Sequence, residues 1–230
     1  MRTLPIDEHW RKKMNDIKEK EFYEGYYANI KFTESELLAA IKEKIKNLNE
    51  QSETKMVEHT VSRIKSPESA INKLILGGHD PTPENAVNIL SDAIGIRLIA
   101  HFIGDIYTIR DVLLEFGDFK VIKEKDYIKN AKPTGYRGYH IIIQTEYDGF
   151  PIRAEIQLRT IAMDCWASLE HQIRYKKGLA NTELIDSELK KCSDDLMSAD
   201  IAMEQIWSMV KAGYSEGDEY IDYFSDQLNM

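Results

Sequence analysis

The chain has 230 residues, of which 43% are hydrophobic and 30% charged, and this is enough to bury a core in one or two domains. Its net charge of -9 argues against a protein that coats nucleic acid or an anionic membrane. The acidity is concentrated at the end, because residues 177–230 carry 4 basic and 12 acidic side chains. The middle of the chain can therefore still bind an anionic small molecule.

The predicted elements alternate between helices and strands. Thr33 and Glu36 have the form of a capping box, and Ser66 with Pro67 is typical of a helix start. Asp148–Gly149 indicates a hairpin, because both turn positions favour positive φ. In chain order we expect a helical region over 7–31, a helix over 34–48, a strand over 56–64, a helix from 67 to the glycines at 77–78, a helix over 83–91, a strand over 95–102, a helix over 105–115, strands over 139–147 and 150–158, and helices over 161–175 and 182–211. This mixture predicts an α/β (α+β) domain with helices packed on a mixed sheet.

Apolar residues in the last predicted helix are spaced alternately four and three apart, which is a heptad seam. The seam either packs on its own domain or joins helices of two subunits, and the spacing does not decide between these. Its members are Ile185, Leu189, Cys192, Leu196, Ala199, Met203, Ile206 and Val210.

No stretch is predicted to cross a membrane, because Arg97 and His101 interrupt the most apolar window, 94–103. The first ten residues lack the apolar core of a signal peptide. The two cysteines, Cys165 and Cys192, are expected to be buried free thiols rather than a disulfide. These features predict a cytoplasmic protein.

The second strand of the hairpin alternates apolar residues with polar ones, which predicts that one face is buried in the core and the other is exposed to solvent. A solvated surface would account for this strand alone, but similar polar groups recur nearby. The polar residues are Arg153, Glu155, Gln157 and Arg159.

Two segments before the hairpin carry polar groups suited to nucleotides. Arg63, Lys65, Ser69 and Lys73 lie at a helix start, where N–H groups favour phosphate, although amphipathic helices carry such charges routinely. Asp92 precedes a strand that contains Arg97, and either residue could simply cap or pair. Strict alternation puts these two side chains on opposite faces, so Asp92 must lie in a turn for both to reach one ligand.

Two further segments are candidates. Residues 132–140 combine Pro and Gly with cations and with Tyr136, which could stack on a base; a turn uses Pro and Gly for shape alone. The helix over 161–175 adds Trp166, Glu170 and His171, for which a partly buried polar network is the alternative. His79–Asp80 resembles a metal-binding pair, but its neighbours are typical of a surface loop.

Together these residues resemble the synthetase domain of the RelA/SpoT family, and the length resembles that of the stand-alone small alarmone synthetases. The matching motifs are Arg63-x-Lys65-x-x-x-Ser69-x-x-x-Lys73, Asp92-x-x-Gly95-x-Arg97, Lys132-Pro-x-Gly135-Tyr136-Arg137-x-Tyr139-His140, Glu155-Ile-Gln-Leu-Arg-Thr160 and Ala162-Met-x-x-Trp166-Ala-x-x-Glu170-His171. They occur in the family's order across about residues 57–176.

The resemblance implies a nucleotidyltransferase-like mixed sheet flanked by helices. It implies a GTP diphosphokinase that moves the β,γ-pyrophosphate of ATP onto the 3′-hydroxyl of GDP or GTP and releases AMP. By the same resemblance, Asp92 and Glu155 are catalytic and bind Mg²⁺. Arg63, Arg97, Lys65, Ser69 and Lys73 bind ATP, the two arginines by sandwiching adenine. Lys125, Lys132, Tyr136, His140, Gln157, Glu170 and His171 face the acceptor nucleotide, with Tyr136 stacking on guanine.

Asp164 departs from the family pattern, since some relatives carry an amide there. We expect a helical N-terminal region over 1–55, a catalytic core over 56–176 and an acidic helical extension over 177–230, with synthesis and no hydrolysis. The resemblance and the seam favour a homo-oligomer, namely a tetramer. Nucleic acid is not required, and regulation by RNA is left open. Lys42, Lys44, Glu58 and His59 could line a regulatory site between subunits, although a solvated surface is the simpler interpretation.

Two other functions fit the same residues. Another nucleotidyltransferase of this fold would release pyrophosphate instead of AMP. A catalytically silent module could sense guanine nucleotide or single-stranded RNA through the tyrosine-bearing loop. The paired carboxylates argue against this silent module, because an anion binder gains nothing from them unless a cation is present.

Overall fold

A computed structural model describes residues 19–52, 54–115, 117, 119–147, 149–175 and 181–212. Five strands form one mixed sheet in the order β1-β2-β5-β4-β3, in which only the β2–β5 pair is parallel. The strands are β1 (Val57–Ile64), β2 (Ile94–Ala100), β3 (Lys120–Asp126), β4 (Tyr139–Tyr147) and β5 (Phe150–Thr160). The predicted α/β class and mixed sheet are confirmed.

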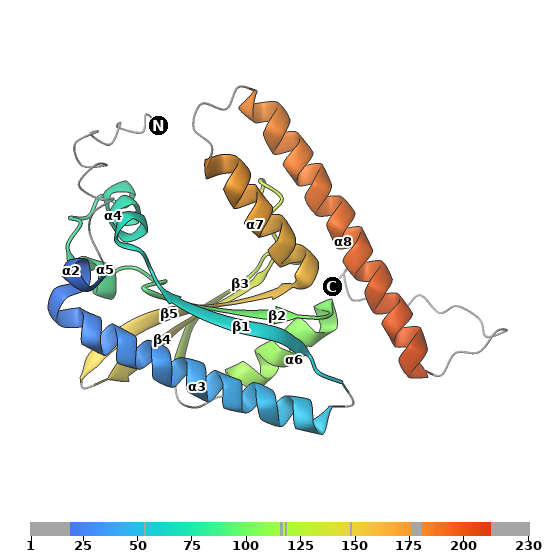
Figure 1. Cartoon of the computed structure of the whole chain (residues 1–230), viewed down its shortest axis with the longest axis horizontal. Helices are drawn as coiled ribbons and strands as arrows, with labels where there is room; N and C mark the ends of the chain where they lie inside the picture. Colours follow the sequence, from blue (N-terminus) through green and yellow to red (C-terminus); the bar gives the residue numbers. More distant parts are fainter. Residues whose placement is uncertain are drawn as a thin grey trace.

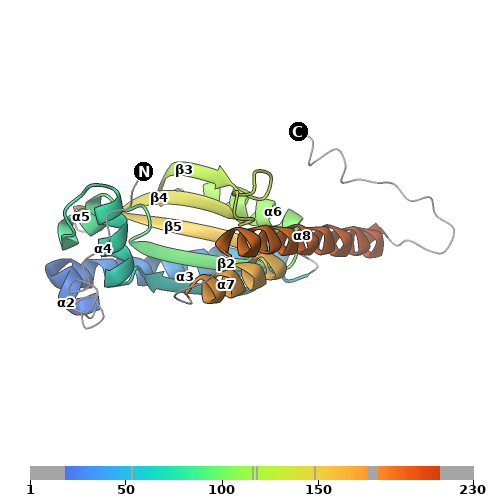
Figure 2. The ribbon, with the colours of Figure 1, turned by 90° about the horizontal axis from the view of Figure 1, so that it is seen from above.

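Helices cover both faces of this sheet (Figure 1). On one side lie α3 and α6; on the other lies α7, with the long α8 packed along it (Figures 1 and 2). The helical elements are α2 (Glu19–Tyr23), the 3₁₀ turn η1 (Glu24–Tyr26), α3 (Tyr27–Gln51), α4 (Pro67–Leu76), α5 (Pro83–Asn88), α6 (Ile103–Leu114), α7 (Ile161–Tyr175) and α8 (Thr182–Ala212). None of the described helices is long and apolar enough to span a membrane.

The two faces of the sheet differ in chemistry because side chains alternate along each strand. The face toward α3 and α6 is a continuous apolar core, and the opposite face carries the polar residues. On β5, Ile152, Ala154, Ile156 and Leu158 are fully buried, and Arg153, Glu155 and Gln157 between them are not. The alternation predicted for this strand is confirmed.

Local start signals set the helix that follows β1. The Ser66 side chain accepts a hydrogen bond from the Ser69 N–H, and Pro67 occupies the first turn of α4, as predicted. Arg63 and Lys65 therefore flank the end of β1. Gly149 has φ 75°, as the predicted hairpin turn requires, whereas Asp148 lies outside the described residues.

Three sequence predictions were wrong. Thr33 does not open a helix: it lies buried inside α3, because an apolar stripe of Ile30, Leu37 and Ile41 extends the helix back to Tyr27. The edge strand β3 was missed, because its sequence KVIKEKD is mostly charged and an edge strand tolerates such exposure. Both cysteines are free, as expected, but they are exposed rather than buried.

The last helix packs on the rest of the chain through a stripe other than the heptad seam. Its buried residues are Leu189, Ser193, Met197 and Glu204, of which only Leu189 belongs to the seam. In the seam, Cys192, Ala199, Met203, Ile206 and Val210 are exposed. Packing of α8 on its own domain therefore explains few of the apolar residues in the seam. The oligomer stays a prediction.

Candidate functional site

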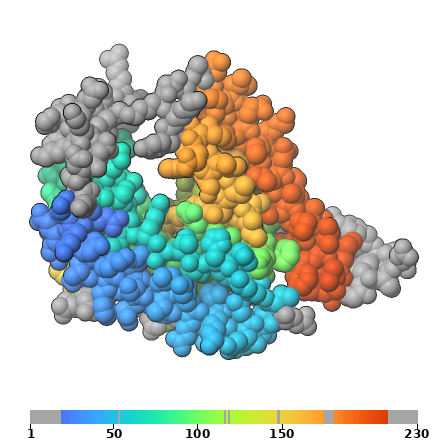
Figure 3. Space-filling model, viewed as in Figure 1, coloured from blue at the N-terminus to red at the C-terminus, as the bar shows by residue number. Residues whose placement is uncertain are grey.

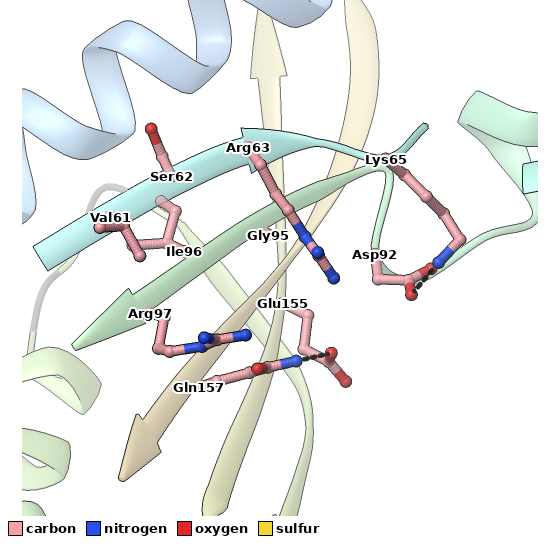
Figure 4. Close-up of a pocket in the computed structure, with 10 residues that line it drawn as sticks. All are labelled: Val61, Ser62, Arg63, Lys65, Asp92, Gly95, Ile96, Arg97, Glu155 and Gln157. Atoms are coloured by element: carbon pink, nitrogen blue, oxygen red, sulfur yellow. Dashed lines mark hydrogen bonds and ion pairs between the residues drawn. The ribbon is translucent and has the colours of Figure 1, made fainter. Parts of the chain in front are cut away.

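A cavity opens on the polar face of the sheet, where β1, β2 and β5 run side by side (Figure 4). In the space-filling view, a hollow separates α4 from α7 on this side of the molecule (Figure 3). The cavity encloses about 130 Å³, below the roughly 300–1,000 Å³ of typical ligand clefts, so a nucleotide would lie mainly across the open face. Its lining residues are Val61, Ser62, Arg63, Lys65, Asp92, Gly95, Ile96, Arg97, Glu155 and Gln157.

Strand register explains why predicted site residues from distant parts of the chain meet here. Residues paired directly across neighbouring strands point to the same face of a sheet. One row across β1, β2 and β5 is Arg63, Gly95 and Glu155. The adjacent row across β2, β5, β4 and β3 is Arg97, Gln157, His140 and Lys125. The sheet therefore gathers seven positions, six of them from the predicted site, onto one surface.

The two cavity arginines come from neighbouring antiparallel strands. Arg63 stands opposite Gly95, and its Cγ lies 3.7 Å from where a Cβ on that glycine would be. Gly95 thus leaves room for the arginine stem to lie over the strand. Both guanidinium groups point into the cavity toward Glu155 (Figure 4). Such planar groups can stack on the faces of a base, which an ammonium cannot do.

Asp92 lies in the turn before β2. This is the position from which Asp92 and Arg97 can both reach one ligand, as the sequence pattern required. Its two oxygens accept hydrogen bonds from Lys65 Nζ at 2.8 Å and Lys73 Nζ at 2.9 Å. Burial would raise the pKa of Asp92, but the two lysines outweigh burial and lower it. The carboxylate is therefore ionised at neutral pH.

Glu155 is held by neighbours on the same sheet face. His140 Nδ1 lies 3.0 Å from Glu155 Oε1, and Gln157 Nε2 donates to Oε2 at 2.7 Å. Burial alone would raise the pKa of Glu155; the bond from His140, the charge that His140 carries when protonated, the bond from Gln157 and the charge of Lys125 outweigh burial and lower the pKa to about 2. Burial lowers the pKa of His140, despite Glu155 beside it, so its neutral Nδ1–H donates.

The loop before β4 brings Tyr136 to the same surface. Gly135 (φ 93°) and Gly138 (φ 154°) shape this loop, and Tyr136 Oη lies 2.6 Å from His140 Nε2. Lys132 Nζ lies 4.7 Å from the centre of the Tyr136 ring. Burial lowers the pKa of Lys132, aided by the nearby cations Lys125 and Arg159 and opposed by Glu155. A tyrosine and a cation are thus held beside the carboxylate.

Not all predicted residues lie in this cluster. Ser69 is exposed in the first turn of α4, and its Oγ bonds Ser66 Oγ at 2.9 Å. Glu170, on α7, pairs with Arg174, which also binds Asp186 of α8. His171 is exposed on the same helix, and the cavity lining includes neither Glu170 nor His171. The nucleotide contacts assigned to these residues stay predictions.

The structure adds two residues to which sequence reasoning gave no role, Arg159 and Asp164. Arg159 is only 6% exposed and donates to Tyr136 Oη and Gln157 Oε1, each at 3.0 Å. Asp164 Oδ1 accepts from both Arg159 and Arg97. The alternation along β5 already put Arg159 on the polar face, but nothing in the sequence indicated that Asp164 would lie between two arginines.

Other sequence candidates lie apart from this cavity. His79 and Asp80 are exposed in the loop between α4 and α5, as expected for a surface loop. Within the described ranges, no three His, Cys, Asp or Glu side chains cluster as a ready-made metal site. A separate open hollow between α3 and β1 includes Lys42, Glu58 and His59 in its lining. Both interpretations of that region stay open.

The carboxylates of the cavity nevertheless suit Mg²⁺. This ion is commonly bound by one or two carboxylates together with substrate phosphates and water. Asp92 and Glu155 both line the cavity, and the pKa of each is lowered. Lys65 and Lys73, which now bind Asp92, could turn to phosphate oxygens when a cation takes their place.

Comparison with known proteins identifies the family. Residues 62–180, more than half of the chain, match the family described as "Region found in RelA / SpoT proteins". The chain belongs to the RelA/SpoT family. It is 43% identical over 146 residues to the GTP pyrophosphokinase YwaC of Bacillus subtilis (strain 168), a match that spans 60% of this chain and 68% of that protein.

Solved structures in this family share the fold. Small alarmone synthetase 1 from Bacillus subtilis, bound to its product pppGpp, superposes with a TM-score of 0.68 at 25% identity, over 89% of this chain and 99% of that one. Small alarmone synthetase 2 from the same species gives a TM-score of 0.64 at 38% identity, over 74% and 93%. The mixed sheet flanked by helices is therefore the architecture of small alarmone synthetases, as the sequence motifs predicted.

Proposed function

We propose that this protein is a (p)ppGpp synthetase, a GTP diphosphokinase that transfers the β,γ-pyrophosphate of ATP to the 3′-hydroxyl of GDP or GTP. One observation carries the proposal: the ionised Glu155 lies between Arg63 and Arg97 on one side and His140 on the other. A carboxylate in that position can accept a hydrogen bond from the hydroxyl of an acceptor nucleotide, while the neighbouring cations bind the donor nucleotide. The relatives named GTP pyrophosphokinase support this assignment.

The donor nucleotide would occupy the β1–β2 side of the cavity. Arg63 and Arg97 would sandwich adenine, while Lys65, Ser69 and Lys73 would hold the phosphates at the start of α4. The acceptor would lie toward β3 and β4, with its guanine on Tyr136. The acceptor would be contacted by Lys125, Lys132, His140 and Gln157. Glu170 and His171 are also assigned to the acceptor side.

In the reaction, the 3′-oxygen forms a bond to the β-phosphorus of ATP, and the bond from that phosphorus to the α,β-bridging oxygen breaks, so that AMP leaves. Glu155 accepts the hydrogen bond of the 3′-hydroxyl and then its proton. A carboxylate whose pKa is about 2 is a weak base, so its main contribution is orientation. This suits phosphoryl transfer, in which the loose transition state needs little early deprotonation.

Asp92 and Glu155 would hold Mg²⁺, and the ion would supply positive charge against the charge that develops on the transferring phosphates. The enzyme is proposed to be a homo-oligomer, with a tetramer favoured. The exposed seam residues Met203, Ile206 and Val210 of α8 support this, being 57%, 53% and 63% exposed. Light scattering tests the assembly, and a monomer at micromolar concentration would contradict it.

The function is tested with Mg²⁺, GDP or GTP, and ATP labelled separately at the γ and α phosphates. We expect the γ label in a more highly phosphorylated guanosine and the α label in AMP. Release of pyrophosphate would instead identify a nucleotidyl transferase, and binding of both nucleotides without transfer of label would identify a sensing module.

A matched pair of variants tests the assigned carboxylate. Glu155→Gln should reduce synthesis on the order of 10²-fold or more, as expected when the carboxylate that orients the 3′-hydroxyl and then accepts its proton is removed. Glu84→Gln, at an exposed position on α5, should leave synthesis unchanged. Full synthesis by Glu155→Gln would refute the mechanism.

A further inference from the structure

We propose that Arg159 and Asp164 are positioning residues that couple the two nucleotide pockets, so that binding of one nucleotide strengthens binding of the other. The inference rests on the proposed function, because it takes Arg97 as a donor contact and Tyr136 as an acceptor contact. It concerns two residues that need not touch either nucleotide.

Asp164 connects Arg159 to the donor side. A single oxygen of Asp164, Oδ1, accepts from Arg97 at 3.0 Å and from Arg159 at 2.9 Å. Burial and then the charge of Arg159 lower the pKa of Arg97, whereas Asp164 raises it. Asp164 therefore stabilises two like charges that would otherwise repel each other.

Arg159 connects Asp164 to the acceptor side. One terminal nitrogen, Nη1, donates to Asp164, and the other, Nη2, donates to both Tyr136 Oη and Gln157 Oε1. The guanidinium also lies 5.1 Å from the centre of the Tyr136 ring. Gln157 in turn donates to Glu155. An unbroken set of direct contacts thus runs from Arg97 to the tyrosine and to the carboxylate.

Asp164 is the shared anchor of both guanidinium groups, because its Oδ1 accepts a hydrogen bond from each. The Nε atoms of Arg97 and Arg159 are buried, and neither has a hydrogen-bond partner among the described residues. When a ligand fixes Arg97, the position of Asp164 is fixed too, and through it Arg159 and the ring of Tyr136. The first nucleotide thereby orders groups that the second would otherwise have to order.

The coupling is measured by calorimetry as the ratio of GDP dissociation constants without and with saturating α,β-methylene ATP, which binds but does not transfer pyrophosphate. In the parent protein we expect a ratio within the ~5–150-fold range typical of coupled sites. In Asp164→Asn the ratio should fall to within about twofold of unity, because a neutral amide no longer balances both guanidinium groups. Asp111→Asn is the matched control, because it removes an Asp–Arg pair on α6, outside the cavity, and should retain the parent ratio.

Arg159→Lys provides a second variant if Asp164→Asn does not fold. A lysine has a single nitrogen, which cannot span the positions that the two terminal nitrogens of Arg159 occupy beside Asp164 and beside Tyr136 and Gln157, so its ratio should also approach unity. In steady-state assays the KM for GDP should fall as ATP rises in the parent, and should be independent of ATP in the variants. A role confined to stability would lower the melting temperature and leave the ratio unchanged.

The proposal is overturned if the parent shows no coupling, or if both variants that fold retain the parent ratio. These outcomes differ from failure of the proposed function. A parent protein that transfers pyrophosphate without coupling refutes only the role of Arg159 and Asp164. Failure to bind α,β-methylene ATP at all refutes the donor pocket and therefore both proposals.

Discussion

The pKa of Glu155 makes a quantitative prediction about stability. In the folded protein this pKa is about 2, against an ordinary value of 4.5. Because the folded-state pKa is depressed, the ionised carboxylate stabilises the fold above pH 4.5, and this contribution is lost as the pH falls toward 2. A difference of about 2.5 units corresponds to about 3 kcal/mol at neutral pH. By the linkage between proton binding and folding, about 1 kcal/mol of this stabilisation is lost between pH 7 and pH 4, and about 1 kcal/mol more is lost by pH 3.

Glu155→Gln removes this titration and the charge beside His140, so the comparison reports on the Glu155–His140 pair. The free energy of unfolding is measured by urea denaturation for the parent and the variant at pH 7, 4 and 3. We expect the free energy of unfolding of the parent, minus that of the variant, to fall by about 2 kcal/mol from pH 7 to pH 3. Glu84→Gln, on the exposed surface of α5, controls for the substitution itself. A parent-minus-variant difference that does not change with pH would falsify the geometry in which His140 and Gln157 hold Glu155.

Three further outcomes test other parts of the structure. Gly135→Ala should destabilise the fold by about 1–3 kcal/mol in urea denaturation, because φ is 93° and a Cβ would lie 3.0 Å from the backbone of α8; Gly25→Ala, with nothing within 4 Å, is the control, and equal stabilities would contradict this packing. Burial raises the pKa of Glu204, so its charged form disfavours folding and Glu204→Gln should gain stability relative to the parent as the pH rises from 4 to 7; a constant difference in unfolding free energy would argue against this burial. Arg63→Lys should raise the KM for ATP on the order of tenfold, through loss of stacking, while the KM for GDP at saturating ATP changes little; an unchanged KM for ATP would remove Arg63 from the donor pocket.

Much of the fold could be predicted from local patterns. The alternation along β5 identified its buried face, and Ser66–Pro67 placed the start of α4, because both depend on side chains close in sequence. The predictions failed where distant packing decides. Thr33 reads as a cap by sequence but is buried in α3, and the charged β3 is a strand only because β4 pairs with it.

The identity and order of the reactive groups follow from the amino-acid sequence alone. Its motifs identified the family and named Glu155, Asp92 and the cations around them. Two arrangements depend on tertiary packing: His140 from the neighbouring strand holds Glu155, and Asp164 from α7 lies between Arg97 and Arg159. Ionisation and contact depend on distance in space. Strand order and register, which pair Gly95 with Glu155 and Arg97 with Gln157, set those distances together with the packing of α7.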